Sequence, residues 1–367
     1  MNVVLLHDWL TGFRGGERVL EVFCEMFPTA PLYTLIHVKD STSPLIENRK
    51  ITASFLNRIP NIDKHYRKAL PLMPLAADFL KITEAADLLI SSSHCVIKGV
   101  KKPKGALHLS YIHSPMRYMY DQYDNYFGPS APLIQRIGAK ICKPYLTGWD
   151  IRSNQNIDVM IANSRFVKER IKKFYNHDAS VIHPFVELQD FKDFKNQSKD
   201  KEDYYLMVTA FAPNKKVDLA VEAFNINKRK LKIIGGGQQE EYLKSIAGKN
   251  IEFMGNLSRK EVIEHFAHAR AFIFPGVEDF GITPLESMAS GTPVIARKIG
   301  GVLETLTDKT AEFFINDSVK ELNEAILRFE NRTFDHSELI KQAGSFSREA
   351  FKENIQKTIN SMMGKSC

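Results

Sequence analysis

Short runs of β-branched or apolar residues alternate with amphipathic helical patterns along almost all of the 367-residue chain. This alternation is typical of α/β proteins, in which parallel strands are joined by crossover helices. In the first half, the predicted strands are Val3–Leu6, Leu88–Ser91, Leu107–Tyr111, Val159–Ala162 and Ser180–Ile182, and the predicted helices are Gly16–Phe27, Leu133–Cys142 and Arg165–Tyr175.

A second series of the same kind begins after residue 203. Its predicted strands are Tyr205–Thr209, Leu231–Ile234, Ile251–Met254, Ala271–Phe274 and Pro293–Ala296, with helices near Val217–Phe224, Gln238–Ile246 and Lys260–His268. The polar stretch from Glu187 to Asp203 has no periodicity, and we interpret it as a linker. A last helix follows Ser347, which can cap it. Its apolar stripe consists of Phe351, Ile355, Ile359 and Met362.

These elements predict two Rossmann-like, doubly wound parallel-sheet domains that face each other across a cleft. In such folds a ligand binds at the carboxyl ends of the strands. We place the first domain at residues 1–187 and the second at residues 188–345. We expect the helix at 346–367 to pack back toward the first domain.

The charge of the chain is unevenly distributed. The net charge is +7, and residues 1–195 hold 26 Lys and Arg against 19 Asp and Glu, whereas residues 196–367 hold 24 of each. An anionic partner should therefore meet the first half. The chain has no run of the ~20 apolar residues that a membrane span needs. It has no secretory signal pattern and no paired cysteines, so we expect a cytoplasmic protein without disulfides or structural zinc.

The segment from Glu278 to Glu286 has the most specific spacing. Thr283 fits a helix N-cap, with Pro284 at the first helical position and Glu286 at the third, which would make a capping box. A helix that opens after a strand and a glycine-containing loop is also a site for a diphosphate, and the two carboxylates could hold sugar hydroxyls. Spacing alone leaves these two interpretations open.

Three further segments could bind or react with a ligand. Gly15 and Gly16 lie between a strand and a helix, His113 follows a buried strand, and Lys215 stands at a helix start. For each of them, a tight turn, a structural histidine or a solvated lysine is the commoner explanation. The chain has no Asp-x-Asp pair for a metal–nucleotide complex and no His-Glu-x-x-His zinc motif.

Taken together, these segments resemble the family 4 glycosyltransferases, which are retaining enzymes of the GT-B fold. Within that family the chain is similar to bacterial mannosyltransferases of O-antigen and exopolysaccharide assembly. The most specific motif is the E-x7-E segment from Glu278 to Glu286. The narrower resemblance rests on His7-Asp-Trp9, Arg14-Gly-Gly-Glu17, Ser91-Ser-Ser-His94, His113-Ser-Pro-Met-Arg-Tyr118 and Ala162-Asn-Ser-Arg-Phe166.

The resemblance implies roles for individual residues. Glu278, Lys215 and His113 would be catalytic: Glu278 would contact the donor sugar, Lys215 would bind the diphosphate, and His113 would lie against the transferred sugar. The residues expected to bind the donor are Gly15, Gly16, Lys215, Glu278, Phe280, Gly281, Ile282, Thr283 and Glu286, of which Glu286 would hold the ribose. The family often has an arginine five residues before the lysine. Here that position is Ala210, so more of the diphosphate binding would fall to Lys215, helped by Lys216 or Arg14.

The function implied is transfer of mannose from GDP-mannose, without a metal, to a lipid-linked oligosaccharide or polysaccharide in cell-surface glycan biosynthesis, such as that of lipopolysaccharide. We expect peripheral contact with the anionic inner face of the plasma membrane through the first domain. Candidate contacts are the lysines at 98, 101, 102 and 104 and the segment Tyr66–Leu75, although a solvated basic face and a core segment explain them equally well.

Three alternatives remain from the sequence. A UDP-sugar could be the donor, or the protein could be a sugar-nucleotide 2-epimerase, which would need no acceptor. A non-catalytic protein that binds membranes or polyanions would also explain the basic half, and its binding would weaken steeply with salt. The E-x7-E segment argues against the last of these, and we expect no nucleic-acid partner.

Overall fold

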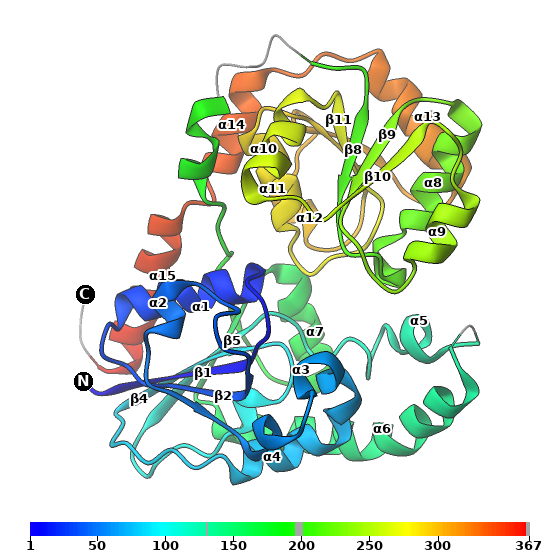
Figure 1. Cartoon of the computed structure of the whole chain (residues 1–367). Helices are drawn as coiled ribbons and strands as arrows, with labels where there is room; N and C mark the ends of the chain where they lie inside the picture. Colours follow the sequence, from blue (N-terminus) through cyan, green and yellow to red (C-terminus); the bar gives the residue numbers. More distant parts are fainter. Residues whose placement is uncertain (130, 195–200, 365–367) are drawn as a thin grey trace. The chain divides into compact units, whose positions relative to one another are not determined.

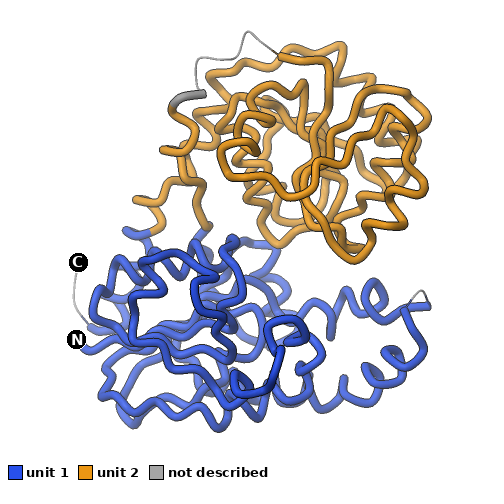
Figure 2. The backbone as a smooth tube through the Cα atoms, viewed as in Figure 1, with its two compact units in different colours: residues 1–183, 352–367 blue, residues 184–351 orange. Residues whose placement is uncertain are grey.

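The computed structural model describes residues 1–129, 131–194 and 201–364. The chain forms two compact units (Figure 2). Unit 1 is residues 1–183 together with the chain from Lys352 onward, and unit 2 is residues 184–351. The first boundary between the two units lies after His183, whereas we predicted it after residue 187.

Unit 1 is built on a sheet of seven strands in the order β3-β2-β1-β4-β5-β6-β7 (Figure 1). All paired strands described in it are parallel. The strands are β1 (Val3–Leu10), β2 (Leu32–His37), β3 (Ile51–Ala53), β4 (Leu88–Ser93), β5 (Leu107–Ile112), β6 (Val159–Ala162) and β7 (Ser180–Val181). The α-helices are α1 (Gly15–Met26), α2 (Pro44–Glu47), α3 (Ile62–His65), α4 (Met73–Phe79), α5 (Tyr123–Phe127), α6 (Leu133–Ser153) and α7 (Arg165–Tyr175).

Unit 2 repeats this plan with six parallel strands in the order β10-β9-β8-β11-β12-β13. The strands are β8 (Tyr205–Val208), β9 (Leu231–Ile234), β10 (Ile251–Gly255), β11 (Ala271–Phe274), β12 (Val294–Arg297) and β13 (Ala311–Phe314). The α-helices are α8 (Val217–Asn227), α9 (Glu240–Ile246), α10 (Arg259–His268), α11 (Ile282–Ala289), α12 (Val302–Thr305), α13 (Val319–Glu330) and α14 (His336–Gly344). Helix α15 (Arg348–Met362) begins in unit 2 and continues in unit 1.

The strand order explains why both sheets are doubly wound. In each sheet the first strand lies in the interior, so the chain adds strands on one side of it and then crosses to the other side. The crossing leaves a topological switch point between β1 and β4 in unit 1 and between β8 and β11 in unit 2, which is where such folds bind ligands. The predicted fold of two doubly wound parallel sheets is confirmed.

The last helix forms as predicted. The hydroxyl of Ser347 accepts the backbone N–H of Ala350 at 3.1 Å, which caps the helix. Phe351, Ile355 and Ile359 are buried, as the apolar stripe requires.

The predicted linker at 187–203 is wrong over its first part. Residues Leu188–Phe194 form a 3-10 helix (η5), and Phe191 is buried in the core of unit 2. Phe191 lies between Asp190 and Lys192, which are both exposed, so its burial is hidden in the sequence by charged neighbours. Residues 195–200 lie outside the described residues.

Lys98 and part of the Tyr66–Leu75 segment are not membrane-facing. Lys98 is buried, and its ammonium forms an ion pair with Asp150 and a hydrogen bond of 3.1 Å to the hydroxyl of Ser153. A buried cation persists when a buried carboxylate pairs with it. In the segment, Tyr66 and Met73 are buried in the core of unit 1.

Candidate active site

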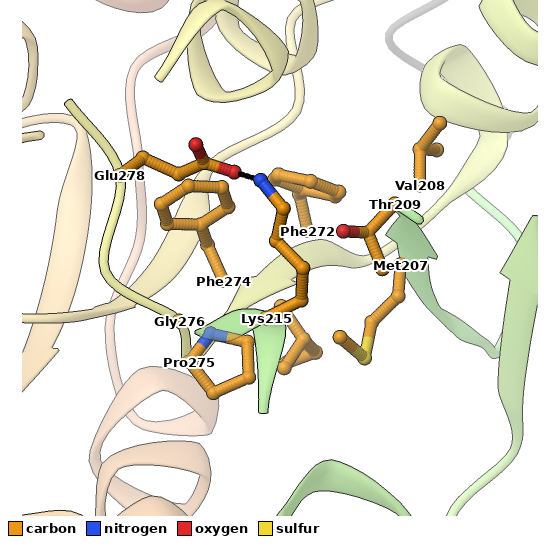
Figure 3. Close-up of a pocket in the computed structure, with 10 residues that line it drawn as sticks. Met207, Val208, Thr209, Lys215, Phe272, Phe274, Pro275, Gly276 and Glu278 are labelled. Atoms are coloured by element: carbon orange, nitrogen blue, oxygen red, sulfur yellow. Dashed lines mark ion pairs between the residues drawn. The ribbon is translucent and has the colours of Figure 1, made fainter. Parts of the chain in front are cut away.

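The switch point of unit 2 holds two of the three predicted catalytic residues. Lys215 ends a short 3-10 helix, η6 (Pro213–Lys215), after β8, and Glu278 follows β11. Their side chains point toward each other and form an ion pair (Figure 3). Each side chain is 19% exposed. They line a small pocket with Thr209, Phe272 and Phe274 at the carboxyl ends of the two neighbouring strands.

Gly276 allows this pair to form, because the loop after β11 passes very close to η6. A Cβ atom on Gly276 would lie 2.6 Å from the carbonyl oxygen of Asn214 and 2.8 Å from the Cα of Lys215. The next residue, Val277, donates its N–H to that same carbonyl at 3.2 Å. The backbone of η6 is therefore held directly against the loop that carries Glu278.

A second close approach fixes the loop from Glu278 to Phe280. Gly301 donates its N–H to the carbonyl of Glu278 at 2.9 Å, and a Cβ on Gly301 would lie 2.3 Å from the carbonyl oxygen of Asp279. The ring of Phe280 is buried and meets the ring of Phe346 at 5.7 Å between centroids. The loop is thus held by backbone contact on one side and by aromatic packing on the other.

Helix α11 begins earlier than the spacing suggested. Its N-cap is Gly281, in the left-handed region with φ of +91°, and Ile282 is its first residue. Thr283 is therefore the second helical position, Glu286 the fifth, and the predicted capping box is wrong. Pro284 is tolerated because the first four N–H groups of a helix have no partner inside the helix. The predicted donor-binding residues from Phe280 to Thr283 form the entry to this helix.

Glu286 does not close a capping box, and its partner within the chain is Arg259. It is buried, with 8% of its surface exposed, and its Oε1 lies 2.6 Å from Nη1 of Arg259. The Nε of Arg259 lies 3.0 Å from a carboxylate oxygen of Asp190. Burial would lower the pKa of Arg259, but the two carboxylates raise it above its ordinary value. The carboxylate of Glu286 is therefore positioned by an arginine rather than by its own helix terminus.

The structure separates Lys216 from the pair. Lys216 has a left-handed backbone with φ of +53°, and its ammonium lies 2.8 Å from a carboxylate oxygen of Asp317. Ala210 is exposed near the same strand end. Arg14 belongs to unit 1. Within unit 2, Lys215 is the cation whose partner is Glu278.

The switch point of unit 1 holds His113, which follows β5. Its ring is half-buried, and Nε2 lies 2.8 Å from the hydroxyl of Ser92 at the end of β4. Burial, together with the neighbouring His94 and His7, lowers the pKa of His113 to about 3. His113 is therefore a neutral imidazole at physiological pH.

Gly15 and Gly16 are the first two residues of helix α1. A Cβ on Gly16 would lie 3.6 Å from Cε1 of His7 and 3.9 Å from Nε2 of His113. The start of α1 and the two histidines therefore meet in one place. Within the described part of the chain, neither ring nitrogen of the buried His7 has a hydrogen-bond partner. Buried polar atoms are usually satisfied, so His7 offers hydrogen bonds that a ligand can complete.

Sequence reasoning assigned no role to Asp8, which organises this end of the sheet. Its two oxygens accept the backbone N–H groups of residues 94–97 at 2.6–2.9 Å. Burial raises the pKa of Asp8, but the charge of His94 and these N–H groups lower it below its ordinary value. Asp8 thereby fixes His94, whose ring meets Trp9 edge-on at 4.4 Å. The position of the His-Asp-Trp motif at the end of a strand is the sequence signal that could have identified Asp8.

Glu17 is a second buried carboxylate that the predictions omitted. It accepts the N–H of Arg14 at 2.9 Å, and its Oε1 lies 3.7 Å from Nε2 of His7. Burial raises its pKa, but the nearby imidazole of His7 brings the pKa down to about 2.

The predicted site residues thus fall into two groups. Lys215, Glu278, Glu286 and the start of α11 lie together in unit 2, and Gly15, Gly16 and His113 lie together in unit 1. In the described ranges, no group of three or more His, Cys, Asp or Glu side chains is arranged to hold a metal ion.

Comparisons with known proteins find similarity in both sequence and fold. The family model described as "Glycosyl transferases group 1" matches residues 189–350, which is nearly all of unit 2. The α-1,3/1,6-mannosyltransferase ALG2 of Saccharomyces cerevisiae is 27% identical over 304 residues, covering 63% of this chain and 60% of that protein. The O-antigen chain mannosyltransferase RfbU of Salmonella typhimurium is 28% identical over 207 residues, covering 50% of this chain and 58% of that protein. The matches span about three fifths of the length of these relatives.

The fold also matches solved structures over its whole length. Sucrose-phosphate synthase from Thermosynechococcus elongatus has a TM-score of 0.73 and 16% identity, covering 100% of both chains. At this identity the likeness shows the fold alone, and it agrees with the GT-B fold predicted from the sequence. No helix in the described ranges combines the length and apolar character needed to cross a membrane.

Proposed function

Because residues 189–350 form a group 1 glycosyltransferase domain, we propose that the protein transfers a hexose from a nucleotide-sugar to a glycan acceptor with retention at the anomeric carbon. The observation that carries this proposal is the Lys215–Glu278 ion pair at the switch point of that domain. A cation and a carboxylate meet there beside the N-terminus of α11. This combination suits a ligand with a diphosphate at one end and sugar hydroxyls at the other.

The leaving diphosphate is stabilised by Lys215 and by the free N–H groups at the start of α11. In the structure, the carboxylate of Glu278 forms an ion pair with the ammonium of Lys215. When the donor binds, its diphosphate becomes a second anionic partner of Lys215, and Glu278 can accept a hydroxyl of the donor sugar. The negative charge on the diphosphate grows as the glycosidic bond breaks, so these groups stabilise the transition state more than the ground state.

The reaction is a same-face displacement. The acceptor oxygen bonds to the anomeric carbon as the bond to the diphosphate oxygen breaks, and the acceptor's hydroxyl proton passes to that leaving oxygen. Glu286, fixed by Arg259, holds the ribose hydroxyls. The neutral His113 contacts the transferred sugar, and Gly15 and Gly16 leave the N-terminus of α1 open to the phosphates. No metal takes part in this scheme.

GDP-mannose is the donor we propose, and a lipid-linked oligosaccharide or polysaccharide is the acceptor. The resemblance of the sequence motifs supports this choice, as does the similarity to two mannosyltransferases, ALG2 and RfbU. We place the reaction at the cytoplasmic face of an anionic membrane, because the excess positive charge lies in the first half of the chain.

A thermal-shift screen tests the donor. A ligand that binds only the native state raises the melting midpoint, and we expect GDP-mannose to do so more than UDP-glucose, dTDP-glucose or ADP-glucose. The Lys215→Ala variant should lose this response. The neighbouring Lys216→Ala variant should keep it, because Lys216 pairs with Asp317 instead of Glu278.

A product assay tests the reaction. We expect mannosylated acceptor to form from GDP-mannose only when a lipid-linked acceptor is present. Release of a free epimerised sugar without acceptor would instead identify an epimerase. Salt-sensitive binding to polyanions without any response to sugar nucleotides would refute enzymatic function.

A further inference from the structure

Helix α6 carries an exposed apolar face that the catalytic proposal does not use. Leu133, Ile134, Ile137 and Ile141 are 65%, 86%, 52% and 71% exposed. At 3.6 residues per turn, these four side chains fall within an arc of about 100° around the helix axis. Figure 1 shows α5 and α6 as an excursion at one side of unit 1. Four large aliphatic side chains thus form one continuous outer stripe.

The rotation of α6 about its axis is fixed by its opposite face. Ala139, Leu146 and Trp149 are buried against unit 1. The indole N–H of Trp149 donates to Asp78, in helix α4, at 3.1 Å. The exposed stripe is therefore held outward by packing on the other side of the same helix.

A row of cations borders the apolar stripe. Arg136, Lys140 and Lys143 fall within an arc of about 60° that lies between one edge of the apolar stripe and the buried face. The chain has no Asp or Glu between Asp124 and Asp150. Arg136 and Lys140 are exposed, and neither forms an ion pair with another described residue. The surface therefore combines exposed hydrocarbon with positive charge that no neighbouring acid neutralises.

We propose that this face of α6 docks on an anionic lipid bilayer, with the aliphatic stripe at the boundary between headgroups and acyl chains. An interfacial helix binds in this way when apolar residues occupy one side and Lys or Arg the flank. Charge argues against a second copy of the chain as occupant. Two stripes packed face to face would bring two unpaired rows of cations together, and like charges in an interface are costly. The inference rests on the proposed function, which requires a lipid-linked acceptor.

Vesicle co-sedimentation of the full chain tests this assignment. We expect binding to vesicles of equal parts phosphatidylglycerol and phosphatidylcholine, and much weaker binding to phosphatidylcholine alone. The double variant Ile134→Asp/Ile141→Asp should lose about tenfold or more of its partitioning for each side chain removed from the bilayer. The double variant Arg136→Gln/Lys140→Gln should lose about fivefold per charge, and only on anionic vesicles.

A matched control uses exposed isoleucines of unit 2. Ile226 and Ile315 are each 68% exposed, so Ile226→Asp/Ile315→Asp introduces the same charges elsewhere and should bind like the parent protein. Unchanged vesicle binding by Ile134→Asp/Ile141→Asp overturns the proposal. So does a parent dimer that this variant converts to a monomer in size-exclusion chromatography, because the stripe then covers a second copy. A further outcome is that the parent protein fails to bind vesicles while GDP-mannose still raises its melting midpoint. In that case the docking inference fails and the proposed function stands.

Discussion

Gly276→Ala should reduce turnover without altering any side chain that contacts the donor. The new Cβ would lie 2.6 Å from the carbonyl oxygen of Asn214, whereas ordinary contact begins at 3.4 Å, so the two backbones must separate by 3.4 − 2.6 = 0.8 Å. The atoms in the way are backbone and cannot rotate aside, so Lys215 moves with them. A misplacement of about 1 Å in a catalytic group can cost roughly 10²-fold in rate. We therefore expect kcat to fall by about two orders of magnitude.

The assay compares kcat at saturating donor with the free energy of unfolding for three glycine variants. Overpacking should cost Gly276→Ala about 1–3 kcal/mol of stability. Gly99→Ala is the control for that cost, because its Cβ would lie 2.4 Å from the ring of Trp149 in unit 1, away from Lys215 and Glu278. Gly344→Ala has no atom within 4 Å of the new Cβ and should match the parent protein in both measurements.

Two results would refute the reasoning. Parental kcat in Gly276→Ala would mean that the position of Lys215 does not limit the reaction. An equal loss of kcat in Gly99→Ala would mean that the loss reflects general destabilisation rather than displacement of Lys215.

Further perturbations test the chemistry and the pH response. Lys215→Ala should lower kcat by ~10²–10³, because one preorganised donor to the leaving group is lost, and a change in KM alone would make the lysine a ground-state anchor. Glu278→Ala should remove most transfer activity at an unchanged melting temperature, and near-parental turnover would contradict the donor site. Glu286→Ala should raise the donor KM, and since Arg259 rather than the helix terminus is its partner, Arg259→Ala should raise it too. EDTA should leave the rate unchanged, and a loss that Mg²⁺ or Mn²⁺ restores would refute metal independence. Burial lowers the pKa of His108 from 6.5 to about 4, so the unfolded chain binds the proton first and this residue removes about 3 kcal/mol of stability as the pH falls from 6.5 to 4. Urea unfolding should therefore show a smaller loss of stability over this pH range in His108→Asn than in the parent, because the contribution of His113 and the other buried histidines remains; equal losses in the two proteins would contradict the assignment.

The sequence predicts the presence of most strands better than it predicts the residues at which the strands and helices end. The apolar run Val3–Leu6 identified β1, but the strand continues to Leu10 through His7 and Asp8, both fully buried. An apolar pattern stops where polar site residues begin, so a strand that carries function looks too short. Strands β2 (Leu32–His37), β3 and β13 were missed altogether. Helix α6 was predicted to end at Cys142, but it continues past Pro144 to Ser153.

The candidate site, like the fold, could be predicted from the sequence only in part. The resemblance of the motifs implied that Lys215 and Glu278 bind the same ligand, and the structure brings the two together after the neighbouring parallel strands β8 and β11. Spacing cannot give a backbone dihedral angle, so the left-handed Gly281 that starts α11 early was hidden. It also cannot pair residues far apart in the chain. The partnership of Glu286 with Arg259 and that of Lys98 with Asp150 became visible only in three dimensions.

The discontinuity of unit 1 sets an order of events during synthesis. Residues 1–183 leave the ribosome first, but Ile355 and Ile359, which are fully buried, follow only after all 168 residues of unit 2, 351 − 183. At ~5–20 residues per second, that delay is roughly 10–30 s. During this interval the nascent first unit exposes the surface that helix α15 will cover, because unit 2 is still being translated. Chaperones that bind exposed apolar surface should therefore engage the first half of the chain, and release should depend on translation of the last helix.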